Sequence, residues 1–440
     1  MIPPKPAPRA DRVGLWHHLR LFRKDILSAQ PARLYRAKMA EFRAPFLRSV
    51  LINDPGLIRE VLVERPEAFP KSGRVTRGLS RLLGNSVFVT NGKTWARQRE
   101  IVNRTFDGPE IRRVFPALLA AGEAAAERVE PGVVDVEPMA SRAAADVIFR
   151  ALFSRPIEDE VAQGVYGAFR DYARAQPIVT PAAFVPWAPT LHGRRTRVAA
   201  KRVRRVIRDV VEARAGEIAT GVAPDDLGTR LMTATHPEAG PMDPGEVLDQ
   251  VAIFFLAGHE TSAAALAWAL YLVADDPGLQ EDIAAEWEGF AKERSFSALA
   301  RMGLTRDVFR ETLRLYPPVP MMVRETSRAE TFRKRHLPSG TQVVISPWHL
   351  HRHEARWEDP DRFDPSRWER RDGQGAFVPF STGPRVCPGA SFAMAEGVVL
   401  LAAIVARHQI TRAGIPVPVA HLTVRSRDGI LLRFSPRSTL

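Results

Sequence analysis

The sequence predicts a mainly α-helical protein with a small β-sheet region, and three observations support this prediction. Most of the 440 residues read as helix interrupted by proline and glycine. Strand-like runs are short and lie toward the two ends of the chain. No internal repeat, low-complexity linker or change of composition divides the chain. We therefore expect a single domain over residues 1–440, with residues 1–40 as an N-terminal extension.

The expected elements alternate with two long loops. The expected helices are Leu57–Glu64, Lys93–Phe106, Ala117–Arg128, Ala140–Ala151, Val198–Thr220, Gly245–Ala274, Gly278–Ala291, Thr305–Leu315 and Ala390–His408. The expected strands are Arg48–Asn53, Gln342–Ser346 and a hairpin of Leu422–Arg425 with Ile430–Phe434 about an Asp-Gly turn. Ser72–Gly92 and Ala175–Gly193 read as loops, and loops of this length often form lids or binding loops.

The cysteine count and the charge exclude several kinds of site. The chain has one cysteine, Cys387, which excludes an internal disulfide and any site with two or more thiolate ligands. The formal net charge is +13, from 63 basic and 50 acidic residues, but the basic residues are scattered and no nucleic-acid-binding motif accompanies them. We therefore expect no nucleic-acid partner. The charge fits either a docking surface for an acidic protein or a solvated exterior.

The apolar segment at 251–274 is long enough to cross a bilayer. Its central Glu260 would cost roughly 2.5–3.5 kcal/mol there, so we expect a buried helix, which starts with a capping-box spacing from Asp243 to Glu246, and no transmembrane anchor. The N-terminus lacks the apolar core of a signal peptide, and a cytoplasmic location is expected. The basic segment near Trp16–Leu27 reads as a solvated helix or, alternatively, as a membrane-surface contact.

The centre of this long helix has an unusual composition. Helical spacing places Phe254, Ala257 and Gly258 on the face of Thr261, so two small residues would leave room for a flat ligand beside a hydroxyl. Glu260 and Thr261 set an acid beside an alcohol, a pair suited to relaying protons into a buried site. The alternative is a core helix whose polar side chains are satisfied locally.

Two further stretches invite a functional interpretation. Glu311 and Arg314 share a helix face, but such a pair contributes only ~0.2–0.5 kcal/mol when exposed and is weak evidence alone. The extended segment that follows carries apolar side chains, and we expect a lipophilic pocket lined by Phe254, Val319, Met321, Met322 and parts of the two long loops.

A histidine-rich segment near residue 350 is a conceivable metal site. His349, His351 and His353 would point the same way on a strand. No carboxylate stands at a clear ligand position, and the segment breaks into loop, so we do not expect a metal there.

The position of Cys387 predicts a thiolate. Pro388 and Gly389 follow it and a strongly apolar helix comes next, so the sulfur would lie at a helix N-terminus, where the helix dipole and free N–H groups stabilise an anion. Arg385 adds a positive charge, and both effects would lower the pKa of the thiol. Gly383 and Gly389 would allow tight turns and close approach of a large planar partner. The alternative is an inert, buried cysteine.

The stretch Phe380-x-x-Gly383-x-Arg385-x-Cys387-x-Gly389 resembles the haem-binding signature of the cytochrome P450 family, in a bacterial-type member without a membrane anchor. Four other stretches resemble motifs of this family in the family's order, over about residue 40 to the C-terminus. They are Trp95-x-x-x-Arg99, Ala257-Gly258-His259-Glu260-Thr261-Ser262, Glu311-x-x-Arg314 and Pro365-Ser366-Arg367-Trp368. Each short motif is weak alone, but five in order are specific. Ser366 replaces the family's usual acid, and Trp95 the histidine of many bacterial members, which suggests a eukaryote-like or fatty-acid-type branch.

The resemblance implies a role for each matching residue. Cys387 would be the thiolate ligand of haem b iron, and Thr261 with Glu260 would deliver protons for the reduction of dioxygen. The propionate-binding residues would be Arg385, Trp95, Arg99 and Arg324. The residues against the haem would be Phe380, Gly383, Gly389, Ala257 and Gly258. A buried ion network would consist of Glu311, Arg314 and Arg367.

The resemblance also implies an activity, namely the insertion of one oxygen atom of O2 into a lipophilic substrate by hydroxylation or epoxidation. A fatty acid, a terpenoid or a steroid-like compound is expected, with electrons from a separate ferredoxin or flavodoxin and its reductase, and a monomeric enzyme. The expected docking residues are Arg97, Arg104, Arg112 and Arg113. The alternatives are a peroxide-driven member, a non-oxidising isomerase and a haem sensor or carrier, which usually lack the acid–alcohol pair.

Overall fold

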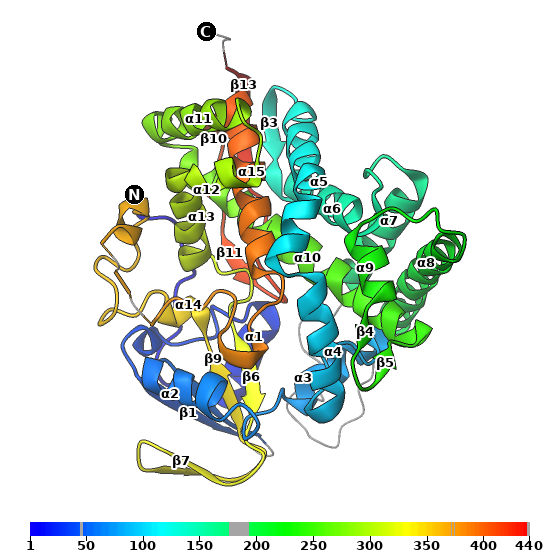
Figure 1. Cartoon of the computed structure of the whole chain (residues 1–440). Helices are drawn as coiled ribbons and strands as arrows, with labels where there is room; N and C mark the ends of the chain where they lie inside the picture. Colours follow the sequence, from blue (N-terminus) through cyan, green and yellow to red (C-terminus); the bar gives the residue numbers. More distant parts are fainter. Residues whose placement is uncertain (45–46, 176–192, 371, 374, 438–440) are drawn as a thin grey trace.

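The computed structural model describes residues 1–44, 47–175, 193–370, 372–373 and 375–437, which form a helical body with small sheets beside it (Figure 1). The longer helices are α1 (Leu15–Lys24), α3 (Gly73–Leu83), α4 (Gly92–Thr105), α5 (Gly108–Glu127), α6 (Val136–Phe153), α7 (Glu160–Ala175), α8 (Arg194–Ala219), α10 (Pro244–Val273), α11 (Pro277–Ala291), α13 (Gly303–Leu315) and α15 (Ala390–Arg407). The shorter helices are α2 (Pro55–Arg59), α9 (Leu227–Thr233), α12 (Phe296–Arg301) and α14 (Pro347–Leu350).

The long helix α10 runs through the centre of the molecule, with α6 and α15 packed along it. Its N-terminus carries the expected capping box, in which the Asp243 side chain accepts from the Glu246 N–H (2.8 Å) and the Glu246 side chain accepts from the Asp243 N–H (3.3 Å). Toward its other end, Trp268 stacks on Tyr316 with ring centroids 3.8 Å apart and donates to the carbonyl oxygen of Val424 (3.2 Å). The capping box thus satisfies the first turn of α10, and the contacts of Trp268 fix its second half against the rest of the fold.

The largest sheet joins the N-terminal part of the chain to residues near 340. Its strand order is β1 (Met39–Ala44), β2 (Leu47–Ile52), β9 (Gln342–Ile345) and β6 (Met322–Glu325). Strands β2 and β9 are parallel, with Val50 opposite Val343, and these two valines share a small second core. Figure 1 shows the blue β1 beside the yellow β6 and β9 at one end of the molecule.

The remaining strands form smaller sheets. A three-stranded sheet has the order β10 (His408–Arg412), β13 (Leu431–Pro436) and β3 (Gly132–Asp135). The two-stranded sheets are β4 (Thr235–His236) with β5 (Gly240–Pro241), β7 (Glu330–Phe332) with β8 (Arg335–Leu337), and β11 (Pro418–Ala420) with β12 (Val424–Ser426). The expected hairpin of residues 422–425 with 430–434 is wrong, because β12 pairs with β11 while β13 pairs with β10 and β3. Strand β12 forms a local hairpin with the strand before it, and β13 takes its partners from other parts of the chain.

The expected helices are present with shifted ends, whereas one of the two expected loops is largely helical. Within Ser72–Gly92, the Ser72 side chain accepts from the Arg74 N–H (3.3 Å) and starts α3, which buries Leu79 and Leu82. The helices α7 and α9 were not expected from the sequence. The other expected loop, Ala175–Gly193, lies almost entirely outside the described residues.

Two described helices are long and apolar enough to cross a membrane. They are α10 and α15, and 83% and 67% of their most hydrophobic windows are buried inside the fold. Burial by protein on most sides is typical of core helices, which agrees with the expectation for residues 251–274.

Candidate active site

Cys387 lies directly before α15, at the end of the turn that begins at Phe380. Its N–H donates to the carbonyl oxygen of Phe380 (2.9 Å), and its own carbonyl oxygen accepts from the Ala390 N–H (3.3 Å). The side chain is exposed, although α15 is otherwise apolar and buried from Ala395 to Val405. The thiol therefore faces open space at the start of a core helix.

Protein atoms surround the sulfur on its other sides, and this burial raises the pKa of Cys387, against the opposing effects of the Gly389 N–H and the positive charge of Arg99. The expectation that Arg385 lowers this pKa is wrong. Arg385 instead stacks over Trp95, with its guanidinium carbon 5.0 Å from the ring centroid, and donates to the carbonyl oxygen of Pro66 (2.6 Å). The surrounding protein therefore favours the thiol form of Cys387, and a metal ion that binds the sulfur has to displace the proton.

The two glycines near Cys387 have different surroundings. Gly383 has φ +72°, and a Cβ there would overlap with the carbonyl oxygen of Leu62, in the π-helical turn Glu60–Glu64. The expected tight turn at Gly383 is therefore present, but backbone and not a large planar partner occupies the direction of its Cβ. A Cβ on Gly389 would meet no atom within 4 Å, so this side of the cysteine turn has free room.

Four basic side chains lie near one another beside the cysteine turn, and two of them contact the ring of Trp95. Three of them, Arg99, Arg324 and Arg385, were expected from the sequence. The fourth is Lys71, which was not, and its Nζ lies 5.5 Å from the centre of the Trp95 ring and donates to the carbonyl oxygens of Val87 and Thr90. Lys71 also forms an isolated β-bridge with Arg324. No local motif marks this lysine, since its neighbours come from distant segments.

These cations are poorly compensated by the protein itself. Among the described residues none of Lys71, Arg99, Arg324 and Arg385 forms an ion pair with a carboxylate, and the buried Nε atoms of Arg324 and Arg385 have no hydrogen-bond partner. Burial, together with Arg385, Arg324 and Arg99, lowers the pKa of Lys71 to about 6, and burial followed by Arg385 lowers that of Arg324 to about 10. Only Glu67 acts on Arg385 with the opposite sign. The donor set fits a ligand with at least two anionic groups.

The centre of α10 opens toward free space on one side. Ala257 is exposed and Thr261 is half-buried, whereas most of the helix around them is buried, and the Thr261 hydroxyl donates to the carbonyl oxygen of Ala257 (2.5 Å). Gly258 does not share this role. A Cβ on Gly258 would lie 2.9 Å from Cδ1 of Ile148 on α6, so its small size permits close helix packing, and the expectation that it clears ligand space is wrong.

Glu260, the acid beside Thr261, has two charged or polar neighbours, Arg425 and His259. Glu260 is buried, and its carboxylate accepts from Arg425 of β12, 165 residues away in sequence. Its other oxygen lies 3.8 Å from Nδ1 of His259. Glu260 and Thr261 are thus neighbours in sequence with different partners, since Glu260 faces Arg425 and His259 while Thr261 bonds its own helix.

A buried hydrogen bond joins the helix of Thr261 to the helix that follows Cys387. The Ser262 hydroxyl donates to Glu396 on α15 (2.6 Å), and Glu396 is 2% exposed. Burial raises the pKa of Glu396 to about 8, although the bond from Ser262 lowers it. No pattern in the sequence marks this contact, which ties together the two helices that carry the site.

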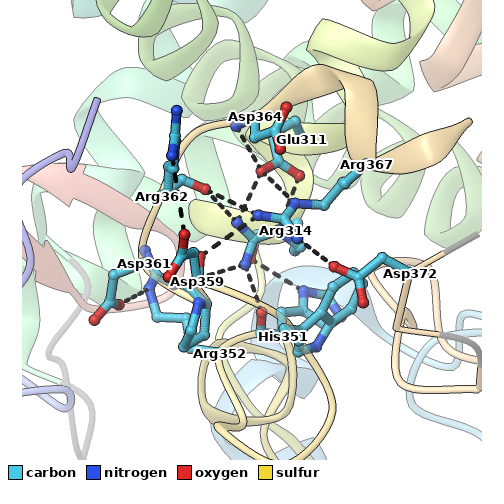
Figure 2. A network of polar contacts seen from close by, with 12 residues as sticks. Glu311, Arg314, His351, Arg352, Asp359, Asp361, Arg362, Asp364, Arg367 and Asp372 are labelled. Atoms are coloured by element: carbon cyan, nitrogen blue, oxygen red, sulfur yellow. Dashed lines mark hydrogen bonds and ion pairs between the residues drawn. The ribbon is translucent and has the colours of Figure 1, made fainter. Parts of the chain in front are cut away.

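Glu311, Arg314 and Arg367 form a buried ion network (Figure 2). Glu311 accepts from Nε and Nη2 of Arg314 (both 2.8 Å), from Nε of Arg367 (3.0 Å) and from the Asp364 N–H (3.1 Å). Arg314 also donates to the carbonyl oxygens of His351, Pro360 and Arg362, and Arg367 pairs with Asp372. The three central side chains are at most 1% exposed, so the network fixes the irregular segment before the cysteine turn.

Two of the three histidines of the HLHRH segment, His349 and His351, make structural hydrogen bonds. His349 belongs to α14 and bonds Ser346, while His351 accepts from the Val378 N–H (2.9 Å), so the segment is not the strand that was considered. Burial lowers the pKa of His349 and of His351 to about 3. No group of three His, Cys, Asp or Glu side chains able to hold a metal occurs in the described part of the chain.

The expected pocket residues lie in different environments. Phe254 is 7% exposed and packs edge-on against Phe106, with ring centroids 4.9 Å apart. Val319 is exposed, Met321 is half-buried, and Met322 begins β6 and packs against the second core. Phe380 packs against the main core.

Three of the four arginines expected at a docking face already have acidic partners within the chain. These contacts are Arg97 with Glu246, Arg104 with Glu100, and Arg113 with Asp225.

Comparison with known proteins identifies the family and agrees with the fold. Residues 4–422 match the cytochrome P450 family, so the chain belongs to the cytochrome P450 family. It is a haem–thiolate monooxygenase. The chain is similar to cyclooctat-9-en-7-ol 5-monooxygenase of Streptomyces melanosporofaciens, with 32% identity over 92% of this chain and 88% of the relative. It is also similar to pentalenene oxygenase of Streptomyces avermitilis, with 29% identity over 87% of each chain.

Solved structures show the same fold. The haem domain of cytochrome P450DA has a TM-score of 0.83 at 22% identity and covers 100% of this chain and 99% of its own. A six-coordinated cytochrome P450 from Thermus thermophilus has a TM-score of 0.70 at 24% identity, over 91% of this chain and 95% of its own. Both likenesses concern the arrangement of the elements.

Proposed function

We propose that Cys387 is the thiolate that ligates the haem iron and that Lys71, Trp95, Arg99, Arg324 and Arg385 hold the two propionates. The observation that carries this proposal is the set of four basic side chains, without a carboxylate partner among the described residues, beside the only cysteine of the chain. Two propionates would pair with these cations and accept from the unsatisfied Nε atoms of Arg324 and Arg385. The bound haem supplies the chemistry by which one atom of O2 enters the substrate.

The side chains of α10 would supply protons to the bound haem site and shape it. Ala257 and Thr261 lie where α10 opens to free space, and Thr261 is a hydroxyl that both donates and accepts. Glu260, the residue before it in the sequence, is a buried acid. In this proposal Thr261 hands protons to the dioxygen being reduced, and Glu260 replenishes them.

The proposed substrate is a cyclic terpenoid hydrocarbon or alcohol. Two relatives carry the names of cyclooctat-9-en-7-ol and pentalenene, and the expected pocket residues Phe254, Val319, Met321 and Met322 offer no charge. Fatty acids and steroids are the other lipophilic classes. The proposed electron donor is a separate ferredoxin or flavodoxin with its reductase, and the proposed location is the cytoplasm.

Two experiments test these roles. In the first, the reduced haem protein is mixed with carbon monoxide. We expect the red-shifted Soret band of thiolate ligation, and its loss in Cys387→Ser. A band typical of histidine ligation in the parent protein would refute the role of Cys387. In the second, the iron spin state is titrated with cyclooctat-9-en-7-ol, pentalenene, palmitate and progesterone. A response to the first pair supports the terpenoid class, and a response confined to palmitate or progesterone refutes it.

A further inference from the structure

A chain of polar side chains leads from α7 to Glu260. The Tyr166 hydroxyl lies 3.2 Å from Oγ of Ser141, and this Oγ lies 2.7 Å from Nε2 of His259. Nδ1 of His259 faces Oε1 of Glu260 at 3.8 Å. The Tyr166 ring also packs edge-on against the His259 ring, with centroids 5.5 Å apart. Three helices, α7, α6 and α10, thus contribute consecutive members of one polar chain.

The burial of these residues increases along the chain. Tyr166 and Ser141 are half-buried, whereas His259 is 3% and Glu260 6% exposed. The chain therefore begins near solvent and ends at the buried acid. Burial lowers the pKa of His259, although Glu260 raises it, so the ring is neutral at pH 7. A neutral imidazole accepts a hydrogen bond at one nitrogen and donates at the other, which is what a proton relay requires.

We propose that Tyr166, Ser141 and His259 relay protons from solvent to Glu260, an inference that rests on the proposed roles of Glu260 and Thr261. A solvent proton binds the Tyr166 oxygen as the tyrosine proton passes to Ser141. The serine proton then passes to Nε2 of His259, and the proton on Nδ1 passes to Glu260. The net result is one proton moved inward and no electron transferred. The relay residues are positioning residues, because they act on the reaction only through Glu260.

The last transfer requires a movement of the Glu260 carboxylate. The distance of 3.8 Å between Nδ1 and Oε1 has to shorten to about 3 Å for a hydrogen bond. Arg425 holds the second carboxylate oxygen of Glu260, and its own side chain is 39% exposed, so it is free to follow or to release the acid. Glu260 would accept its proton on the side of His259 and pass it toward Thr261 after turning away from Arg425.

A purely structural role for the same hydroxyls makes different predictions. Ser141 and Tyr166 would then only satisfy a buried imidazole nitrogen, and their removal would lower stability without affecting proton supply. Hydroxylation with O2 consumes two protons and two electrons per product molecule, whereas hydroxylation with hydrogen peroxide needs neither from outside. Comparing the two oxidants in the same variant therefore separates proton delivery from structural damage.

The test uses the haem-loaded protein with a surrogate ferredoxin and its reductase, and the first compound that shifts the spin state in the screen above. The variants are Ser141→Ala and Tyr166→Phe, and the control is Tyr316→Phe, which removes a buried hydroxyl bonded to the Pro4 carbonyl oxygen (2.7 Å). We expect product per electron to fall roughly tenfold in Ser141→Ala. A smaller fall is expected in Tyr166→Phe, because water can replace a half-buried phenol. Peroxide-driven product formation should stay within roughly twofold of the parent.

A spectroscopic measurement adds a readout independent of turnover. In the diamagnetic carbon monoxide complex, nitrogen-15 resonances of labelled histidine, assigned by their loss in His259→Asn, should show a neutral ring whose tautomer population shifts in Ser141→Ala. A doubly protonated His259 ring would refute the relay. So would unchanged product per electron in both variants, or an equal loss with O2 and with peroxide. Thr261→Ala separates a failure of the relay from a failure of the proposed function. If Thr261→Ala uncouples turnover while the relay variants do not, the relay is refuted and the proposed function stands.

Discussion

The buried ion network gives the sharpest test of what holds the irregular segment before the cysteine turn. We consider Glu311→Gln, which keeps the size of the side chain and removes its charge. Glu311 is fully buried and accepts four hydrogen bonds, three of them from Arg314 and Arg367. An amide has one oxygen, so its NH2 group would face a guanidinium donor, and the charges of both arginines would lose their shared partner.

The magnitude follows from the burial. Removing one partner of a buried ion pair costs about 3–5 kcal/mol. Unfolding entropy is about 2.1 cal/mol/K per residue, or about 0.9 kcal/mol/K for 440 residues, so the melting temperature should fall by about 3–5 °C. Three backbone carbonyls still bind Arg314, and Asp372 still pairs with Arg367, which keeps the loss within this range.

The assay is differential scanning calorimetry of the haem-loaded protein at one fixed scan rate. The matched control is Glu100→Gln, which removes the acid of an exposed pair with Arg104 (2.7 Å, side chains 44% and 53% exposed). That pair contributes less than about 1 kcal/mol, so the control should melt within about 1 °C of the parent. If Glu311→Gln also melts within about 1 °C of the parent, buried charge pairing does not stabilise this region and the reasoning is wrong.

Three further predictions concern single residues of the site. Thr261→Ala should bind haem and substrate as the parent does but release more peroxide and less product per electron, and equal product per electron would remove Thr261 from the mechanism. Lys71 takes up a proton when a dianion binds, because its pKa of about 6 then rises. The haem affinity of the parent, measured by titrating haem-free protein, should therefore weaken from pH 6.5 to 8.5. In Lys71→Met the affinity should weaken much less over the same range. The pKa of Glu396 is raised from its ordinary value of 4.5 to about 8, because the folded protein favours the neutral carboxyl. The contribution of Glu396 to the free energy of unfolding should therefore be highest below pH 4.5, where Glu396 is neutral in both states, and should fall as the pH rises from 4.5 through 8. Glu396→Gln cannot ionise, so its melting temperature should rise relative to that of the parent between pH 5 and pH 8.5, and parallel pH profiles of the two proteins would contradict this.

The parts of the site that the sequence predicted are those written in short local motifs. Local patterns indicate three of these features. Cys387 precedes a helix start, Thr261 follows two small residues on one helix face, and Glu311 and Arg314 share a helix face. The site residues that sequence reasoning missed depend on distant contacts. Lys71 meets Trp95 and Arg324 through the fold alone, and no pattern near residue 71 indicates these neighbours.

The errors about glycine have a common physical cause. Helical periodicity shows that Gly258 lies near Thr261 on the helix, but it does not show which neighbouring element covers that side. In the structure α6 does so through Ile148, and the backbone of Leu62 covers Gly383 in the same way. A missing side chain leaves room for whatever packs there, and protein packs there more often than a ligand does. The hairpin error is similar, since the strand partners of residues 431–436 come from distant parts of the chain.

The contacts of Glu260 show why the acid–alcohol pair needs more than its own two residues. Arg425 compensates the charge of Glu260 from one side, which keeps a buried carboxylate tolerable but also holds it away from Thr261. His259 approaches from the other side with a nitrogen that is linked through Ser141 to a half-buried hydroxyl. The two neighbours therefore face different oxygens of the same carboxylate. A proton arriving through His259 neutralises Glu260 and removes the attraction to Arg425, so delivery of the proton is itself what frees the acid to turn toward Thr261.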